Sequence, residues 1–211
     1  HAVKNLTTAE GGALAWRTID GVDNDELYHE LQLYSLHGQS KDALSKNKAG
    51  AWEYDVVYPA YKCNMTNINA AIGIAQLERY EGLLERRRVL NERYEAALEK
   101  LGIKVMHHYT DEMTSTGHLY LVRIPGASVD DRNAVIQEMA EREIACNVHY
   151  KPLPMMTAYK NLGFDIADYP NAYHQYENLI SLPIFSTMTD EQNEYVIENF
   201  VDILKKRGLI K

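Results

Sequence analysis

The longest helical pattern of the chain opens with the stretch Tyr61-Lys62-Cys63-Asn64-Met65-Thr66-Asn67-Ile68-Asn69-Ala70-Ala71-Ile72-Gly73. From Ile68 to Leu101 the apolar residues keep a helical spacing, which predicts one long helix. Thr66 can cap its start, and Gly102 marks its end. Such a helix is long for a globular protein, and helices of this kind typically tie two domains together. We therefore expect a two-domain organisation around it.

Upstream of this helix, the residue pattern predicts a buried strand, a helix, a loop and a second strand, over residues 12–16, 23–36, 39–50 and 52–58. The first strand is a short apolar run after paired glycines. Asp23 or Asn24 is the expected cap of the helix, and Gly38 ends it. Pro59 stops the second strand, because proline cannot donate to a strand ladder.

Downstream, strand and helix patterns alternate. The expected strands cover residues 118–124 and 144–150, and the expected helices cover residues 128–143 and 172–179 and the segment after Thr189. Thr189 and Gln192 form a capping box. The helix that they open has an apolar face made of Tyr195, Val196, Phe200, Ile203 and Leu204. The alternation indicates an α/β fold class.

The composition is that of an ordinary globular protein. The 211 residues carry 22 Lys and Arg against 30 Asp and Glu, a formal net charge of −8. This acidic balance argues against a nucleic-acid partner, since such binders show basic patches. No apolar stretch is long enough for a transmembrane helix, so we expect no membrane partner. Cys63 and Cys146 form no metal-binding spacing, and we expect reduced thiols and a cytoplasmic location.

Lys4 is the first candidate for chemistry. It precedes Thr7 and the glycine pair Gly11 and Gly12, where a backbone can approach a ligand closely. A lysine partly removed from water can act as an amine nucleophile toward carbonyls. The competing interpretation is an ordinary solvated side chain, as for most lysines.

Asn64 and His149 mark two further candidate sites. The N-terminus of a helix attracts phosphate, and Asn64 could donate to one just before the long helix. On physics alone, a capping role for Asn64 or Thr66 is favoured. His149 follows an expected strand, where α/β folds often place ligands, although a lone histidine is more often structural. No metal-site spacing, dinucleotide-binding motif, Walker motif or hydrolase elbow occurs.

Taken together and in this order, the segments around these candidates resemble the DegT/DnrJ/EryC1/StrS family of PLP-dependent sugar aminotransferases. The matching segments are His1–Gly12, Tyr61–Gly73, Val148–Tyr150, Ser181–Ile184 and Met188–Gln192. The resemblance runs over essentially the whole chain, and its first segment is the most specific.

The resemblance implies a role for each candidate residue. Lys4 matches the lysine that holds pyridoxal 5'-phosphate (PLP) and later moves the proton between substrate and cofactor. Asn64 matches a residue that reaches the PLP phosphate of the partner subunit, which implies a homodimer with shared active sites. His149 and Tyr150 match a region near the substrate pocket, and no metal is implied.

The resemblance also implies the reaction. Lys4 stands where sugar dehydratases of the family carry histidine, so it points to transamination. The implied amino donor is L-glutamate, and the implied acceptor is a nucleotide-linked keto sugar, with a lean toward a 4-keto sugar. The products of such reactions feed surface polysaccharide, lipopolysaccharide or amino-sugar pathways. The alternatives are a non-catalytic regulatory or binding module of the same fold and a PLP-dependent sugar dehydratase.

By the same resemblance, the chain is the C-terminal half of a fold-type I, aspartate aminotransferase-like transferase. Residues 1–70 are then the tail of the large PLP-binding domain, and residues 71–211 are a small C-terminal α/β domain. The family carries the carboxylate for the pyridine nitrogen, the ring-stacking aromatic and a phosphate loop upstream of the lysine. We therefore expect an N-terminal segment of the same protein to complete the enzyme.

Overall fold

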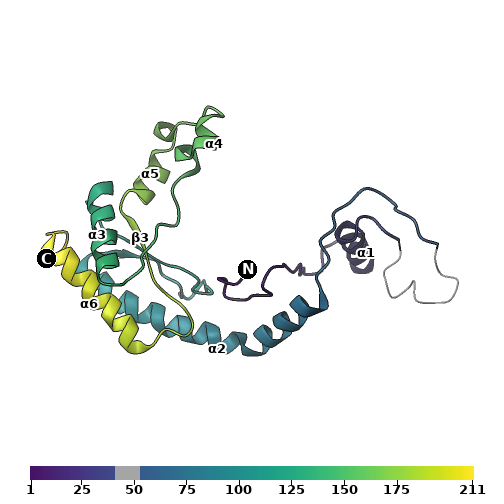
Figure 1. Cartoon of the computed structure of the whole chain (residues 1–211), viewed down its shortest axis with the longest axis horizontal. Coiled ribbons are helices and arrows are strands. Elements are labelled where there is room, and N and C mark those ends of the chain that lie inside the picture. The colour runs from purple at the N-terminus through teal and green to yellow at the C-terminus, as the bar shows by residue number, and fades with distance from the viewer. Residues whose placement is uncertain (41–52) are drawn as a thin grey trace. The chain divides into compact units, whose positions relative to one another are not determined.

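The computed structural model describes residues 1–40 and 53–211 of the chain (Figure 1). The predicted loop over residues 39–50, and Trp52 with it, fall largely outside these described residues. The chain divides into two compact units, His1–Glu78 (unit 1) and Arg79–Lys211 (unit 2).

Unit 1 contains the first predicted helix. Helix α1 spans Asn24–Ser35, and the Asp23 carboxylate caps it by accepting hydrogen bonds from the backbone N–H groups of Asp25 (2.8 Å) and Glu26 (3.0 Å). Gly38 follows the helix with φ +73°, and its N–H donates to the carbonyl of Leu33 (2.7 Å). A Cβ atom at this position would lie 1.9 Å from the carbonyl oxygen of Tyr58, which explains why glycine stands there.

The two strands predicted in unit 1 are wrong. Residues 12–16 have no strand conformation, and Leu14 is 74% exposed rather than buried. In the second segment, Val56 makes one isolated bridge with Gln39. A strand needs a partner for its backbone groups, and the described residues supply neither segment with one beyond that bridge.

Helix α2 is the long helix that the sequence predicts, and it spans Asn67–Leu98. The Thr66 hydroxyl accepts a hydrogen bond from the backbone N–H of Asn69 (3.2 Å), as expected of an N-cap. A turn of 3₁₀ helix, η2, covers Glu99–Leu101, and Gly102 closes it with φ +79°. Both predicted ends are therefore confirmed.

The sheet of unit 2 has three antiparallel strands in the order β1-β2-β3. The strands are β1 (Lys104–Val105), β2 (Tyr120–Arg123) and β3 (Leu179–Leu182). Only β2 matches a predicted strand. The strand expected over residues 144–150 is reduced to one bridge between Asn147 and Ser181. The helix expected over 172–179 ends earlier, because Leu179 pairs with Arg123 in the sheet.

Unit 2 also contains several helices besides this sheet. The capped helices are α3 (Val129–Glu141) and α6 (Asp190–Lys206), and the short ones are α4 (Thr157–Lys160), α5 (Pro170–Tyr176), η3 (Leu153–Met155) and η4 (Ile166–Asp168). Ser128 forms a capping box with Asp131, and Thr189 forms the predicted one with Gln192. In Figure 1, α3 and α6 lie together near the later part of α2.

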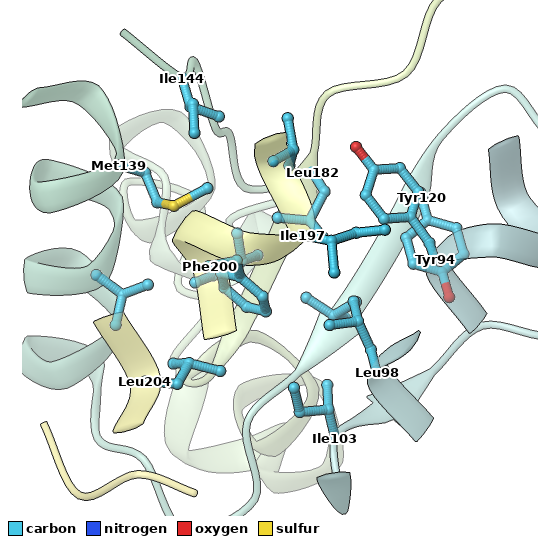
Figure 2. Packing of buried hydrophobic residues seen from close by; sticks show 14 of the residues in the cluster. Tyr94, Leu98, Ile103, Tyr120, Met139, Ile144, Leu182, Ile197, Phe200 and Leu204 are labelled. Carbon is cyan, nitrogen blue, oxygen red and sulfur yellow. The ribbon is translucent and has the colours of Figure 1, made fainter. Parts of the chain in front are cut away.

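The core of unit 2 is one cluster of buried apolar side chains from α2, the sheet, α3 and α6. Figure 2 shows Phe200 and Leu204 of α6 among Met139 of α3, Leu182 of β3 and Leu98 of α2. The predicted apolar face of the last helix is confirmed except at Tyr195, which is half exposed. The burial of these apolar side chains is the main contribution to the stability of the unit.

Candidate functional site

Lys4 lies in a turn at the start of unit 1. Its backbone N–H donates to the carbonyl of His1 (3.1 Å), and its side chain is exposed. The expected partial removal of this amine from water is therefore not seen among the described residues. The whole turn over residues 1–4 is exposed, so nothing in this unit covers the Lys4 side chain.

Residues 8–11, which follow Lys4, pack against Met65 and the start of α2. A Cβ atom on Gly11 would lie 2.6 Å from the Thr8 hydroxyl and 2.9 Å from the Met65 methyl group, so a larger residue there would require these two side chains to move. The side-chain amide of Asn69 donates to the carbonyl of Glu10 (2.9 Å). Two motifs far apart in the sequence thus meet in unit 1.

Asn64 lies between these contacts and α1. It lines a hollow of about 260 Å³ together with residues of α1, among them His29 and Gln32. Lys62 Nζ donates to Asn64 Oδ1. Because the oxygen of this amide already accepts a hydrogen bond, the amide nitrogen of Asn64 is the group suited to a phosphate oxygen. The cap of α2 is Thr66, so the capping alternative does not apply to Asn64.

His149 and Tyr150 belong to unit 2. His149 Nδ1 lies 2.8 Å from Ser181 Oγ, a buried hydroxyl on β3, and this contact orients the imidazole ring. Tyr150 is 67% exposed, and its ring meets that of His149 edge to face at 4.7 Å. The segment Ser181–Ile184 already stood out in the sequence as one that resembles the family. Nothing in the sequence predicted that Ser181 contacts His149.

The described residues offer little for metal or thiol chemistry. Within residues 1–40 and 53–211, no three His, Cys, Asp or Glu side chains are grouped to hold a metal ion. Cys63 and Cys146 are both free thiols, and burial raises the pKa of the Cys146 thiol to about 12. No helix in the described part of the chain is long and apolar enough to cross a membrane.

The chain belongs to the DegT/DnrJ/EryC1/StrS aminotransferase family, whose family model matches residues 1–201. This confirms the family predicted from the sequence motifs. It is 34% identical over 209 residues to the spore coat polysaccharide biosynthesis protein SpsC of Bacillus subtilis, a match that covers 97% of this chain and 52% of that protein. The chain thus spans about half the length of the curated relatives it matches.

Two solved structures with similar coordinates are forms of one protein described as a putative sugar aminotransferase. The PMP form of the putative sugar aminotransferase Spr1654 from Streptococcus pneumoniae has a TM-score of 0.92 and 51% identity, covering 98% of this chain and 52% of that one. Its PLP form has a TM-score of 0.90 and 49% identity, covering 98% and 50%. The chain therefore has the fold of this part of a sugar aminotransferase.

Proposed function

We propose that the protein containing this chain is a PLP-dependent aminotransferase that transfers the amino group of L-glutamate to a nucleotide-linked 4-keto sugar, for surface polysaccharide or amino-sugar synthesis. The observation that carries the proposal is the match to Spr1654 over 98% of the chain, in both PLP and PMP forms. The likeness to SpsC supports a polysaccharide product.

The residues of unit 1 fit PLP. Lys4 offers an exposed primary amine for the aldehyde of the cofactor. The amide nitrogen of Asn64 and the neighbouring Lys62 ammonium suit its phosphate. In the proposed enzyme, residues 1–70 are the end of the large domain of a fold-type I transferase, and residues 71–211 are its small domain. An N-terminal segment and a second subunit of the homodimer supply the remaining contacts.

The bound cofactor would supply an electron sink for the carbanion formed at the substrate carbon. The chain's own contribution is positioning and proton transfer. In the proposed reaction, Lys4 Nζ takes the proton from the α-carbon of glutamate and later delivers one to the sugar carbon that receives the amine. His149, held by Ser181, and Tyr150 bind and orient the substrate in the proposed reaction.

The test uses the full-length protein, L-glutamate labelled with ¹⁵N and a nucleotide-linked 4-keto sugar. We expect ¹⁵N in the sugar product and a visible absorption band from PLP bound to the lysine. Lys4→Ala should remove the band and lower the rate by at least about 10²-fold. Lys100→Ala, which removes an equally exposed lysine of η2, should leave both unchanged.

Three other results of this experiment would contradict the proposal. A sugar product that has lost oxygen but carries no ¹⁵N would identify a dehydratase. The absence of any spectral change with PLP and amino donor would identify a non-catalytic module of the same fold. An absorption band unchanged in Lys4→Ala would contradict the assignment of Lys4.

A further inference from the structure

A groove of about 420 Å³ lies on the side of the unit 2 sheet away from the core. Alternate residues of β2 and β3 face opposite ways, so Val122, Ile180 and Leu182 enter the core while their neighbours face the groove. The residues that line the groove include Lys104, Met106, Leu121, Arg123, His149 and Leu179. Its volume is in the range of small-molecule sites, about 300–1,000 Å³.

Two cations face each other at this groove. Lys104 of β1 is the direct register partner of Arg123 of β2, and like charges placed opposite each other destabilise a strand pair. None of the residues that line the groove is acidic. Lys104 makes no ion pair with any residue in the described ranges. This concentration of positive charge occurs in a chain with net charge −8.

The Arg123 guanidinium is held in place without being neutralised. It donates to Asn178 Oδ1 (3.0 Å), Gln175 Oε1 (2.8 Å) and the carbonyl oxygen of His174 (2.6 Å), and all three acceptors are uncharged. A guanidinium has five N–H donors, so this arrangement orients the group and leaves donors for an anion. The geometry is therefore that of a prepared anion site, not of a structural ion pair.

Apolar side chains form the rest of the groove. Leu121, Leu179 and Met106 supply a surface against which the flat or apolar part of a ligand can pack. The His149 ring lines the same groove and is oriented by the buried hydroxyl of Ser181. An inorganic anion alone would leave this apolar surface unused, so the groove fits an organic phosphate better.

We propose that this groove binds a phosphate-bearing organic anion, the nucleoside diphosphate half of the nucleotide-linked sugar. The diphosphate lies between Lys104 and Arg123, and the nucleoside packs on the apolar side chains. The identity of the ligand rests on the proposed function, whereas the anion site rests on the register of β1 and β2.

The test measures equilibrium binding of UDP, dTDP, inorganic diphosphate and uridine to the full-length protein by calorimetry, without an amino donor. At least one nucleoside diphosphate should bind more tightly than inorganic diphosphate and at least about tenfold more tightly than uridine, as expected for a charge-assisted contact. Lys104→Gln should weaken binding of that nucleotide about tenfold, and Lys104→Glu should weaken it further. The matched control Lys100→Gln removes the same charge outside the groove and should have no effect.

A second measurement separates binding from a structural role. Without ligand, Lys104→Glu should raise the melting temperature, because it places opposite charges across the strand pair. Stability and nucleotide affinity thus change in opposite directions in one variant. Unchanged affinity in Lys104→Glu, an equal loss in Lys100→Gln, or equal binding of uridine or inorganic diphosphate would overturn the proposal. Because no step of transamination is measured, these results are independent of the Lys4 experiment.

Discussion

Unit 1 and unit 2 carry similar apolar patterns but bury them very differently. In unit 2, Ile203 and its neighbours are fully buried in one cluster. In unit 1, Leu33 is the one buried apolar side chain among the described residues, and Ile68 on α2 is 75% exposed. An apolar pattern thus predicts that a side chain will be buried. Whether this chain itself buries the side chain depends on the residues that lie near it in space.

Several large apolar side chains of unit 1 are exposed in this chain. They include Leu14, Tyr61, Ile68, Ile74 and Leu77, each more than half exposed. Large exposed apolar areas are typical of sites covered by another protein or domain. This supports the proposal that an N-terminal segment and a second subunit complete unit 1.

The largest expected effect on the free energy of unfolding comes from replacing an isoleucine by alanine, once in each unit. Ile203→Ala should lower the free energy of unfolding of the 211-residue chain by about 2–5 kcal/mol, because it leaves a cavity in the core. Ile68→Ala should change it by less than about 0.5 kcal/mol, because the side chain is already in water. Chemical denaturation followed by circular dichroism measures both.

Two further variants sharpen this comparison. Ile203→Val, which removes one methylene group, should cost about 0.5–1.5 kcal/mol. In the full-length protein, Ile68→Ala should become more costly than in this chain, because the proposed N-terminal segment and second subunit would cover its surface. Equal costs for Ile68→Ala and Ile203→Ala in the 211-residue chain would contradict the contrast between the units.

The next largest effect is expected when the N-cap residue of a helix is replaced, once in each unit. Thr189→Ala should lower the free energy of unfolding of unit 2 by about 0.5–2 kcal/mol, since the hydroxyl accepts from the backbone N–H of Gln192 (3.2 Å). Asp23→Ala removes an equivalent cap from α1 and should speed amide hydrogen exchange within α1 alone. Hydrogen exchange with mass spectrometry resolves the two regions.

The control for the cap is Thr189→Ser, which keeps the hydroxyl group and should be close to the unchanged protein. If Asp23→Ala shifted the unfolding midpoint of unit 2 as much as Thr189→Ala does, the two units would unfold together, and the local role of the α1 cap would be wrong.

The smallest effect concerns charge in unit 2, where two adjacent histidines differ in burial. Burial lowers the pKa of His108, which stacks on Tyr120 at 5.8 Å. A hydrogen bond with Glu95 (2.8 Å) raises the pKa of the exposed His107. In the unfolded chain His108 takes up a proton below about pH 6.5, whereas in the folded chain it does so only at a lower pH. The free energy of unfolding of unit 2 should therefore fall as pH decreases from about 6.5 to the folded pKa of His108.

His107 acts in the opposite direction. The ion pair of protonated His107 with Glu95 stabilises the folded state fully below about pH 6.5. This stabilisation is lost as pH rises through the raised pKa that His107 has in the folded state. Denaturation at several pH values checks both, with an expected change of less than one bound proton for each. His108→Phe, which keeps an aromatic ring, should flatten the acid side, and His107→Ala the neutral side. An acid slope unchanged in His108→Phe would show that other groups cause it.

The local features of the chain were predictable because their signals lie within a few residues. Asp23, Ser128 and Thr189 cap their helices through bonds to the next turn, and Gly102 ends the long helix. The strands were predicted poorly for the opposite reason. Leu179–Leu182 pairs with Tyr120–Arg123, far away in the sequence, and no local pattern encodes such a partner.

The sequence by itself determined the family, the long helix and the order of the candidate segments around Lys4, Asn64 and His149. These depend on residue identity and on bonds between near neighbours. Only the tertiary structure decided which groups meet: Gly11 against Met65, His149 against Ser181, and Lys104 opposite Arg123. Such contacts depend on strand register and close packing, which form only when distant parts of the chain come together.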